Sequence, residues 1–230
     1  MLNKSFKIPG KMDKLFTEAD HKIVEEAVVA AEKKTAGEIV PYIIKRSGQY
    51  RETAWKAAVQ FGLVAVVLIF SMSMFYAGWS FGWLFTFTGG ATVILASGIT
   101  GAVLARYVPI LERLFVSDAA MNEAVQNRSA RAFLEEEVFS TRDRTGILIF
   151  ISLFEHRVEV VGDTEINARV DPEDWAYVVE DILLGIKSGS LAGGLARAIE
   201  RCGTLLSERD LVIREDDENE LSDSVRLRDS

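Results

Sequence analysis

The chain has 230 residues, of which 49% are hydrophobic and 26% charged, and its formal net charge is -8. Residues 57–105 contain no Asp, Glu, Lys, Arg or His, whereas residues 106–230 carry 15 basic and 26 acidic side chains. An acidic balance disfavours nucleic-acid binding, which needs basic groups to neutralise phosphates. A single uncharged run of 49 residues argues against both a fully soluble fold and a polytopic transporter.

The uncharged run is too long for one membrane span and fits two, because a spanning helix needs about 20 apolar residues to cross roughly 30 Å of hydrocarbon. A segment rich in Gly and Trp, residues 78–83, divides it. Trp favours the membrane interface. We therefore predict a transmembrane hairpin over residues 55–106, with helices at about 57–77 and 84–105.

Basic residues flank both ends of the predicted hairpin, and none lies in its turn. The six are Lys45, Arg46, Arg51, Lys56, Arg106 and Arg113. Because Lys and Arg near the ends of spans stay on the cytoplasmic side, we expect a two-span protein of the cytoplasmic (inner) membrane with both termini in the cytoplasm.

The segment before the hairpin predicts an N-terminal arm over residues 1–14, then one helix and one strand. Thr17 is suited to cap the helix, with Asp20 three residues later, and Gly37 is suited to end it. The apolar run Ile39–Ile44 follows as a strand. Pro41 lacks a backbone donor, which predicts an edge strand or a bulge.

After the hairpin, Ser117 or Asp118 can cap a helix over about 119–139. The run 147–153 is apolar at every position but one, which is typical of a strand buried on both faces. Residues 158–161 are expected to return as its hairpin partner.

Asp171 followed by a proline predicts a helix that runs to about Lys187. Ser190 begins a last helix, in which Cys202 lies on the apolar face and is interpreted as a small core residue rather than a nucleophile. Gly193-Gly194 is interpreted as a close-packing point between helices. Residues 209–230 are acidic and lack an apolar periodicity, which predicts a disordered tail.

Neither side of the hairpin has enough strands for a stable sheet alone. We therefore predict one discontinuous α/β domain from residues 15–50 and 115–208, in which the strand at 39–44 pairs in the same sheet as the strand at 147–153. The return of the chain by a two-helix hairpin brings the two segments together, and loop closure becomes only slowly more costly with length.

Four segments follow a recognisable order. They are the run Thr35-Ala36-Gly37-Glu38 before the first predicted strand, Arg142 to Ser152 in the second, Glu155 to Asp163 in the hairpin that follows, and residues 188–200 in the closing helix. In this order they resemble the corresponding segments of the TPM-domain family. The chain is most similar to bacterial members that carry a transmembrane hairpin inside the domain.

The resemblance implies an α/β/α sandwich with a small mixed sheet. Through a relative of the thylakoid lumen it also implies acid phosphatase activity, with calcium bound near acidic residues. The family's site depends on an Asp-Asp pair after the second strand, where this chain has Glu155-His156. With Asp163 and Glu165, Glu155 could hold calcium or another divalent cation. Calcium prefers six to eight oxygen ligands, so three carboxylates supply only part of a site, and a solvated hairpin end is the other interpretation.

Two functions follow. The first is a membrane-anchored, non-catalytic binding or assembly module at the cytoplasmic membrane face, whose partner is a membrane or membrane-associated protein. The alternative is a divalent-metal-dependent phosphatase of the TPM type, in which the cation polarises a phosphoryl oxygen. His21 and His156 are far apart and are interpreted as surface groups.

Overall fold

The computed structural model describes residues 16–75, 82–209, 211 and 219–229. The arm predicted at 1–14 and most of the turn predicted at 78–83 lie outside these residues. The chain divides into two compact units, Met1–Gly48 with Asn122–Ser230 and, between them, Gln49–Met121. We call them the α/β unit and the hairpin unit.

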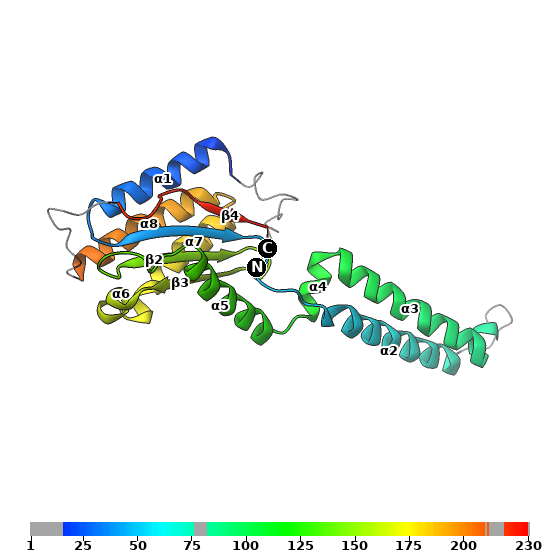
Figure 1. Ribbon diagram of the computed structural model, residues 1–230. Helices are drawn as coiled ribbons and strands as arrows, with labels where there is room; N and C mark the ends of the chain where they lie inside the picture. The colour runs from blue at the N-terminus through cyan, green and yellow to red at the C-terminus, as the bar shows by residue number, and fades with distance from the viewer. Residues whose placement is uncertain (1–15, 76–81, 210, 212–218, 230) are drawn as a thin grey trace. The chain divides into compact units, whose positions relative to one another are not determined.

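The α/β unit contains helices on both faces of a small sheet (Figure 1). Its elements, in chain order, are α1 (Glu18–Glu32), β1 (Glu38–Ile44), α5 (Asp118–Glu135, from Asn122 on), β2 (Gly146–Ser152), β3 (Arg157–Gly162), α6 (Thr164–Arg169), the 3-10 helix η3 (Pro172–Trp175), α7 (Ala176–Ser188), α8 (Leu191–Glu208) and β4 (Arg226–Arg228).

The sheet is mixed and has the strand order β3-β2-β1-β4. β1 runs parallel to β2 in continuous register, from Glu38 opposite Gly146 to Ile44 opposite Ser152. β2 and β3 form the antiparallel hairpin expected from the sequence. The predicted pairing of the strand before the hairpin unit with the strand after it is therefore confirmed.

Pro41 lies in a central strand, so the prediction of an edge strand or a bulge is wrong. The amide of Glu38 donates to Thr145 at 3.2 Å, and the carbonyl of Ile44 accepts from Leu153 at 3.0 Å, so even-numbered residues of β1 direct their backbone groups toward β2. Successive residues alternate in direction, and the nitrogen of Pro41 thus faces away from β2. On that side β4 pairs only from Tyr42 onward, which explains why the missing donor is tolerated.

Alternate side chains of the central strands build two cores, one on each face of the sheet. Ile39, Ile43 and Ile149 pack in a large core with residues of α1, α7 and α8. Tyr42 and Phe150 face the opposite side and pack in a smaller core with residues of α5. The sheet is thus covered by three long helices on one face and by α5 on the other.

In the α/β unit the helical starts predicted at Thr17 and Ser190 are confirmed, and the segment after Asp171 begins as the 3-10 helix η3. Two predicted ends are wrong, because α5 ends at Glu135 rather than near residue 139 and α1 also ends early. Thr17 caps α1 with the expected box, in which Asp20 N–H donates to the Thr17 hydroxyl at 3.2 Å and the Asp20 carboxylate accepts from Thr17 N–H at 2.9 Å. α1 ends at Glu32 rather than near Gly37. The reason is tertiary: the amide of Ala36 donates at 3.2 Å to the carbonyl of Leu211 instead of continuing the helix.

The close-packing role predicted for the glycine pair is confirmed at Gly194. A Cβ there would lie 2.6 Å from the Cα of Gly185, so the backbones of α7 and α8 are in contact. Cys202 is fully buried in the same core, and burial raises the pKa of its thiol to about 12. It is a core residue, as expected.

The prediction of a disordered tail over 209–230 is wrong for residues 219–229. Arg226–Arg228 form β4, which pairs in parallel with β1. The carboxylate of Glu136 holds this strand through Arg226 at 3.3 Å and Arg228 at 3.0 Å. Charged side chains, which suggested a solvated end, here make ion pairs that attach a short strand to the sheet.

The hairpin unit consists of α2 (Glu52–Phe75), the 3-10 helix η2 (Gly82–Phe85), α3 (Phe87–Tyr107) and α4 (Pro109–Phe115). α2 begins five residues before the predicted position, and α4 was not predicted. By length and composition α2 and α3 could each cross a membrane. The Ser97 hydroxyl of α3 donates to the carbonyl of Phe61 in α2 at 3.0 Å. A Cβ at Gly101 would lie 2.7 Å from the Phe61 ring, so small residues allow this close approach.

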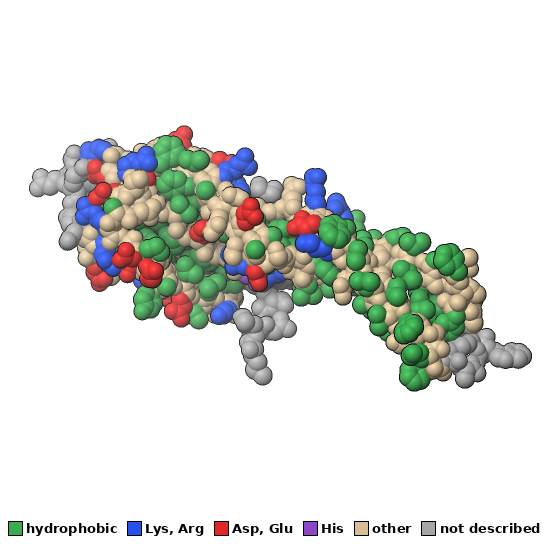
Figure 2. All heavy atoms as spheres, turned by 90° about the horizontal axis from the view of Figure 1, so that it is seen from below, with side chains coloured by type: hydrophobic (Ala, Val, Ile, Leu, Met, Phe, Trp, Pro, Cys, Tyr) green, Lys and Arg blue, Asp and Glu red, His purple; other side chains and the backbone are tan. Residues whose placement is uncertain are grey.

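The surface of the hairpin unit is predominantly hydrophobic. Figure 2 shows hydrophobic side chains along the two long helices and charged side chains only toward their base. Val67, Phe70, Leu95 and Ile99 are each 61–67% exposed.

Candidate functional site beside strand β3

Glu155 is a buried structural carboxylate and not a solvated hairpin end. Its side chain is 1% exposed. It accepts hydrogen bonds from the backbone N–H of Ser47 at 3.0 Å and from the Ser152 hydroxyl, and the two serine hydroxyls are 2.8 Å apart. Ser47 follows β1 and Ser152 ends β2, so Glu155 joins the ends of two parallel strands.

Asp163 and Glu165 are both paired with arginines. Asp163, 4% exposed, caps α6 by accepting from Thr164 N–H at 2.7 Å and lies 2.9 Å from the Nε of Arg144. Glu165 pairs with Arg169 at 2.6 Å on the surface of α6. Each carboxylate thus has a cationic partner from the protein itself.

The three carboxylates do not form one cation site. Glu155 lies in the turn next to the pair Ser152 and Arg157, whereas Asp163 follows the pair Ile147 and Gly162 at the other end of the same hairpin. Five residue steps at about 3.4 Å each separate these ends by roughly 17 Å. Within the residues that the structure describes, no group of three or more His, Cys, Asp or Glu side chains could hold a metal ion. The calcium-binding set suggested by the resemblance therefore does not fit this chain.

A polar groove of about 300 Å³ lies along β3, between residues of α5 and α7. Its polar lining consists of Asn122, Gln126, His156, Arg157 and Glu159. Its apolar lining consists of Val125, Val158, Val179 and Leu183. We call this the β3 groove.

The β3 groove combines fixed charges with the end strand of the sheet. The Glu159 carboxylate accepts from the Ser129 hydroxyl of α5 at 2.7 Å, which fixes its position. His156 has a φ of 53°, a left-handed conformation in which His is enriched among non-glycine residues. β3 pairs with β2 only, within the part of the chain that the structure describes. An end strand presents unpaired N–H and C=O groups, to which an extended peptide can pair.

Sequence reasoning did not identify this groove. Asn122 and Gln126 lie one turn apart on α5, and polar residues at that spacing look like any solvent-exposed helix face. The sequence predicts His156 to be a surface group in a turn, and the structure places it in the lining of the groove. His21, the other histidine, packs against the Phe16 ring with centroids 5.4 Å apart, far along the chain from the groove.

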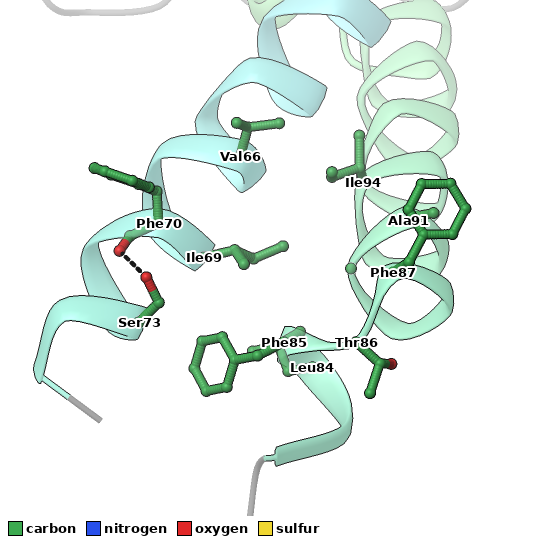
Figure 3. A pocket seen from close by; sticks show the side chains of 11 residues that line it. Val66, Ile69, Phe70, Ser73, Leu84, Phe85, Thr86, Phe87, Ala91 and Ile94 are labelled. Atoms are coloured by element: carbon green, nitrogen blue, oxygen red, sulfur yellow. Dashed lines mark hydrogen bonds between the residues drawn. The ribbon is translucent and has the colours of Figure 1, made fainter. Parts of the chain in front are cut away.

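A second, apolar hollow of about 430 Å³ lies between α2 and α3 in the hairpin unit (Figure 3). Val66, Ile69 and Ile94 are among the side chains that line it. Its two hydroxyls donate to backbone carbonyls of their own segments, Ser73 to Phe70 at 2.7 Å and Thr86 to Trp83 at 2.6 Å. The hollow thus directs no free hydroxyl donor toward a ligand.

The fold defines a mixed α/β unit with an apolar two-helix insertion. A solved structure is similar, the NMR structure of the BA42 protein from the psychrophilic bacterium Bizionia argentinensis. The similarity covers 95% of this chain and 99% of BA42, with a TM-score of 0.56 and 18% sequence identity, and at that identity it concerns the fold alone. No protein-family model matches the sequence, and no curated protein matches it significantly.

Proposed function

We propose that the chain is a membrane-anchored, non-catalytic binding or assembly module of the TPM type. In this proposal α2 and α3 cross the cytoplasmic membrane as a hairpin and keep both ends of the chain on the cytoplasmic side. The α/β unit then presents the β3 groove to a membrane or membrane-associated protein.

The observation that carries the proposal is the exposed apolar surface of α2 and α3. Phe70 is 63% exposed and Leu95 is 67% exposed, and contiguous apolar patches of this kind mark membrane or protein interaction sites. The two helices contain 24 and 21 residues, which at 1.5 Å per residue span about 30 Å or more. The six basic residues that flank the uncharged run support the cytoplasmic orientation.

The positions in the fold of the segments that resemble the TPM-domain family support this assignment. Gly37-Glu38 opens β1 and Thr145-Gly146 opens β2, and the two strands pair side by side in parallel. The motif from Glu155 to Asp163 contains the turn and β3, which border the groove.

A binding role agrees better with the described side chains than the phosphatase alternative does. A cation-dependent phosphatase needs carboxylates that converge on one metal ion, whereas Glu155 and Asp163 lie at opposite ends of the β2–β3 hairpin. The β3 groove instead offers charged groups of both signs beside an end strand.

Site-specific photo-crosslinking in native membranes tests the proposal. A benzophenone amino acid at Gln126, within the groove, is expected to give a discrete adduct with a partner protein. The matched control is Lys22, which is exposed on α1, and it is expected to give none. Equal adducts at both positions, or none at Gln126, would contradict the binding role. Turnover of a phosphate monoester by the purified protein would contradict the non-catalytic assignment.

A further inference from the structure

We propose that α4 is an interfacial helix that lies in the phospholipid headgroup layer of the membrane. Its exposed apolar side chains contact lipid, and the arginines around it contact lipid phosphates. The inference rests on the proposed membrane anchoring of α2 and α3, and it adds a lipid-binding element outside the two spans.

The chain changes direction between α3 and α4. Val108 closes α3 by donating to the Leu104 carbonyl at 2.9 Å and accepts from Glu112 N–H, in α4, at 3.0 Å. Its backbone is extended, with φ -111° and ψ 100°. Pro109 has no N–H to continue the α3 ladder, but it is suited to the first position of a new helix. Figure 1 shows α4 as a separate short helix beside the base of α2 and α3, rather than an extension of α3.

One side of α4 is an apolar surface without a covering element in the described hairpin unit. Ile110 and Leu114 are one turn apart and are 67% and 73% exposed, and Tyr107, at the end of α3, is 76% exposed. Leu111 and Phe115, by contrast, are only partly exposed. The outward side of α4 is thus apolar as well as the side that is partly covered, and an apolar helix face needs an apolar partner.

The charges around α4 favour a phosphate layer. In the hairpin unit, residues 49–121, the basic side chains are Arg51, Lys56, Arg106 and Arg113, and the acidic ones are Glu52, Glu112 and Asp118. All four basic groups lie near the base of α2 and α3 or in α4, at the ends of the apolar helices. Arginine at this level of a membrane helix can reach phosphate oxygens while its stem remains among apolar groups.

The length of α2 places α4 at the depth of the headgroups. Trp55, 60% exposed near the start of α2, lies about 30 Å along the helix from Phe75 at its end, at 1.5 Å per residue. That distance matches the hydrocarbon thickness of a bilayer, and Trp and Tyr mark membrane interfaces. Trp55 and Tyr107 belong to the same end of the hairpin as α4. The lipid that covers α2 and α3 therefore also contacts Ile110 and Leu114.

Fluorescence quenching in nanodiscs tests the inference on the full chain. Three variants, Leu114→Cys, Val67→Cys and Glu25→Cys, each receive an environment-sensitive label at the new thiol. The natural cysteine, Cys202, is fully buried and needs no replacement. The discs contain phosphatidylcholine and phosphatidylglycerol, and the quenchers are aqueous iodide and nitroxides attached to either the lipid headgroup or the acyl chain.

The label at position 114 is expected to be quenched by the headgroup nitroxide and protected from iodide. The label at position 67, in the middle of α2, should respond to the acyl-chain nitroxide, and the label at position 25, on α1, to iodide. Combining Arg106→Gln and Arg113→Gln with the label at 114 should shift the equilibrium between lipid-bound and free α4 by roughly 30-fold, at about fivefold per charge. This shift appears as increased iodide quenching.

The inference would be overturned if iodide quenched the label at position 114 as strongly as the label at position 25 while the label at position 67 remained in lipid. That result would leave the membrane anchor intact. Protection of 114 from every quencher would mean that protein covers α4, in this chain or a second copy, and would also overturn it. Iodide quenching at 67 would instead refute the proposed membrane insertion itself, and the role of α4 with it.

Discussion

Replacing Gly194 by alanine is expected to destabilise the α/β unit, because the change inserts a methyl group between two helix backbones. The new Cβ would lie 2.6 Å from the Cα of Gly185 and 3.0 Å from the carbonyl oxygen of Asp181. Backbone atoms cannot rotate away, so α7 and α8 must separate. Overpacking of this kind costs about 1–3 kcal/mol, and the higher helix propensity of alanine offsets up to about 1 kcal/mol.

The neighbouring glycine is a matched control. A Cβ at Gly193 would meet the hydroxyl of Ser190 at 2.7 Å, which is the end of a side chain that can change rotamer. Gly193→Ala should therefore be neutral or slightly stabilising. The free energies of unfolding of the two variants should differ by about 1–3 kcal/mol, with Gly194→Ala the less stable.

The single thiol provides the assay. Cys202 lies on α8 and is fully buried, so its reaction with a thiol reagent during a urea titration reports opening of the α/β unit and not of the hairpin unit. Gly194→Ala should react at a lower urea concentration than the unmodified chain, and Gly193→Ala should not. Equal midpoints for the two variants would refute the argument that α7 and α8 are in backbone contact.

Three further predictions concern the acidic groups and the insertion. Burial raises the pKa of Glu32 from 4.5 to about 8, so the folded state binds the proton of this carboxyl more tightly than the unfolded state does. The stabilisation of the folded state by this proton is therefore lost as the pH rises from about 5 to about 8. Glu32→Gln should stabilise the chain by an amount that grows over this range and then levels off, measured by thermal unfolding from pH 5 to pH 9; a gain independent of pH would contradict the shift. Glu155→Ala should cost about 1–3 kcal/mol because the Ser47 amide loses its buried partner, whereas Glu155→Gln should cost less in the same urea titration; equal losses would show that the acceptor oxygen is unimportant. Replacing residues 49–121 by a short Gly/Ser linker should leave a soluble, cooperatively unfolding α/β unit with dispersed NMR amide signals, and aggregation of that protein would contradict the two-unit division.

The central strands and the helix starts could be predicted because their signals are local or follow from burial. The run 147–153 is so apolar that it needs cover on both faces, and its partner strand had to come from before the insertion. Thr17 and Asp171 begin their helical segments, as their side chains predict. The helix starts depend on residues a few positions apart, and the central strand depends on an apolar run that only burial on both faces of a sheet satisfies.

The parts that could not be predicted depend on partners far away in the sequence. Arg226–Arg228 has one apolar residue and no periodicity, and it becomes a strand because Glu136, about 90 positions earlier, holds both arginines. Glu155 looked like a solvated turn residue, yet its carboxylate is buried by the segment after β1, 108 positions away. The β3 groove likewise combines residues of α5, β3 and α7, which lie far apart in the sequence, so no single segment indicates it.

The central claim is that α2 and α3 form a membrane hairpin with both chain ends in the cytoplasm. Labelling of intact spheroplasts with a membrane-impermeant maleimide tests it most directly, using a single added cysteine at Ser80, between the two helices, or at Ser222, near the C-terminus. We expect position 80 to react from outside and position 222 to react only after the membrane is permeabilised. Reaction of position 222 in intact spheroplasts would contradict the cytoplasmic orientation, and protection of both positions until permeabilisation would contradict the hairpin.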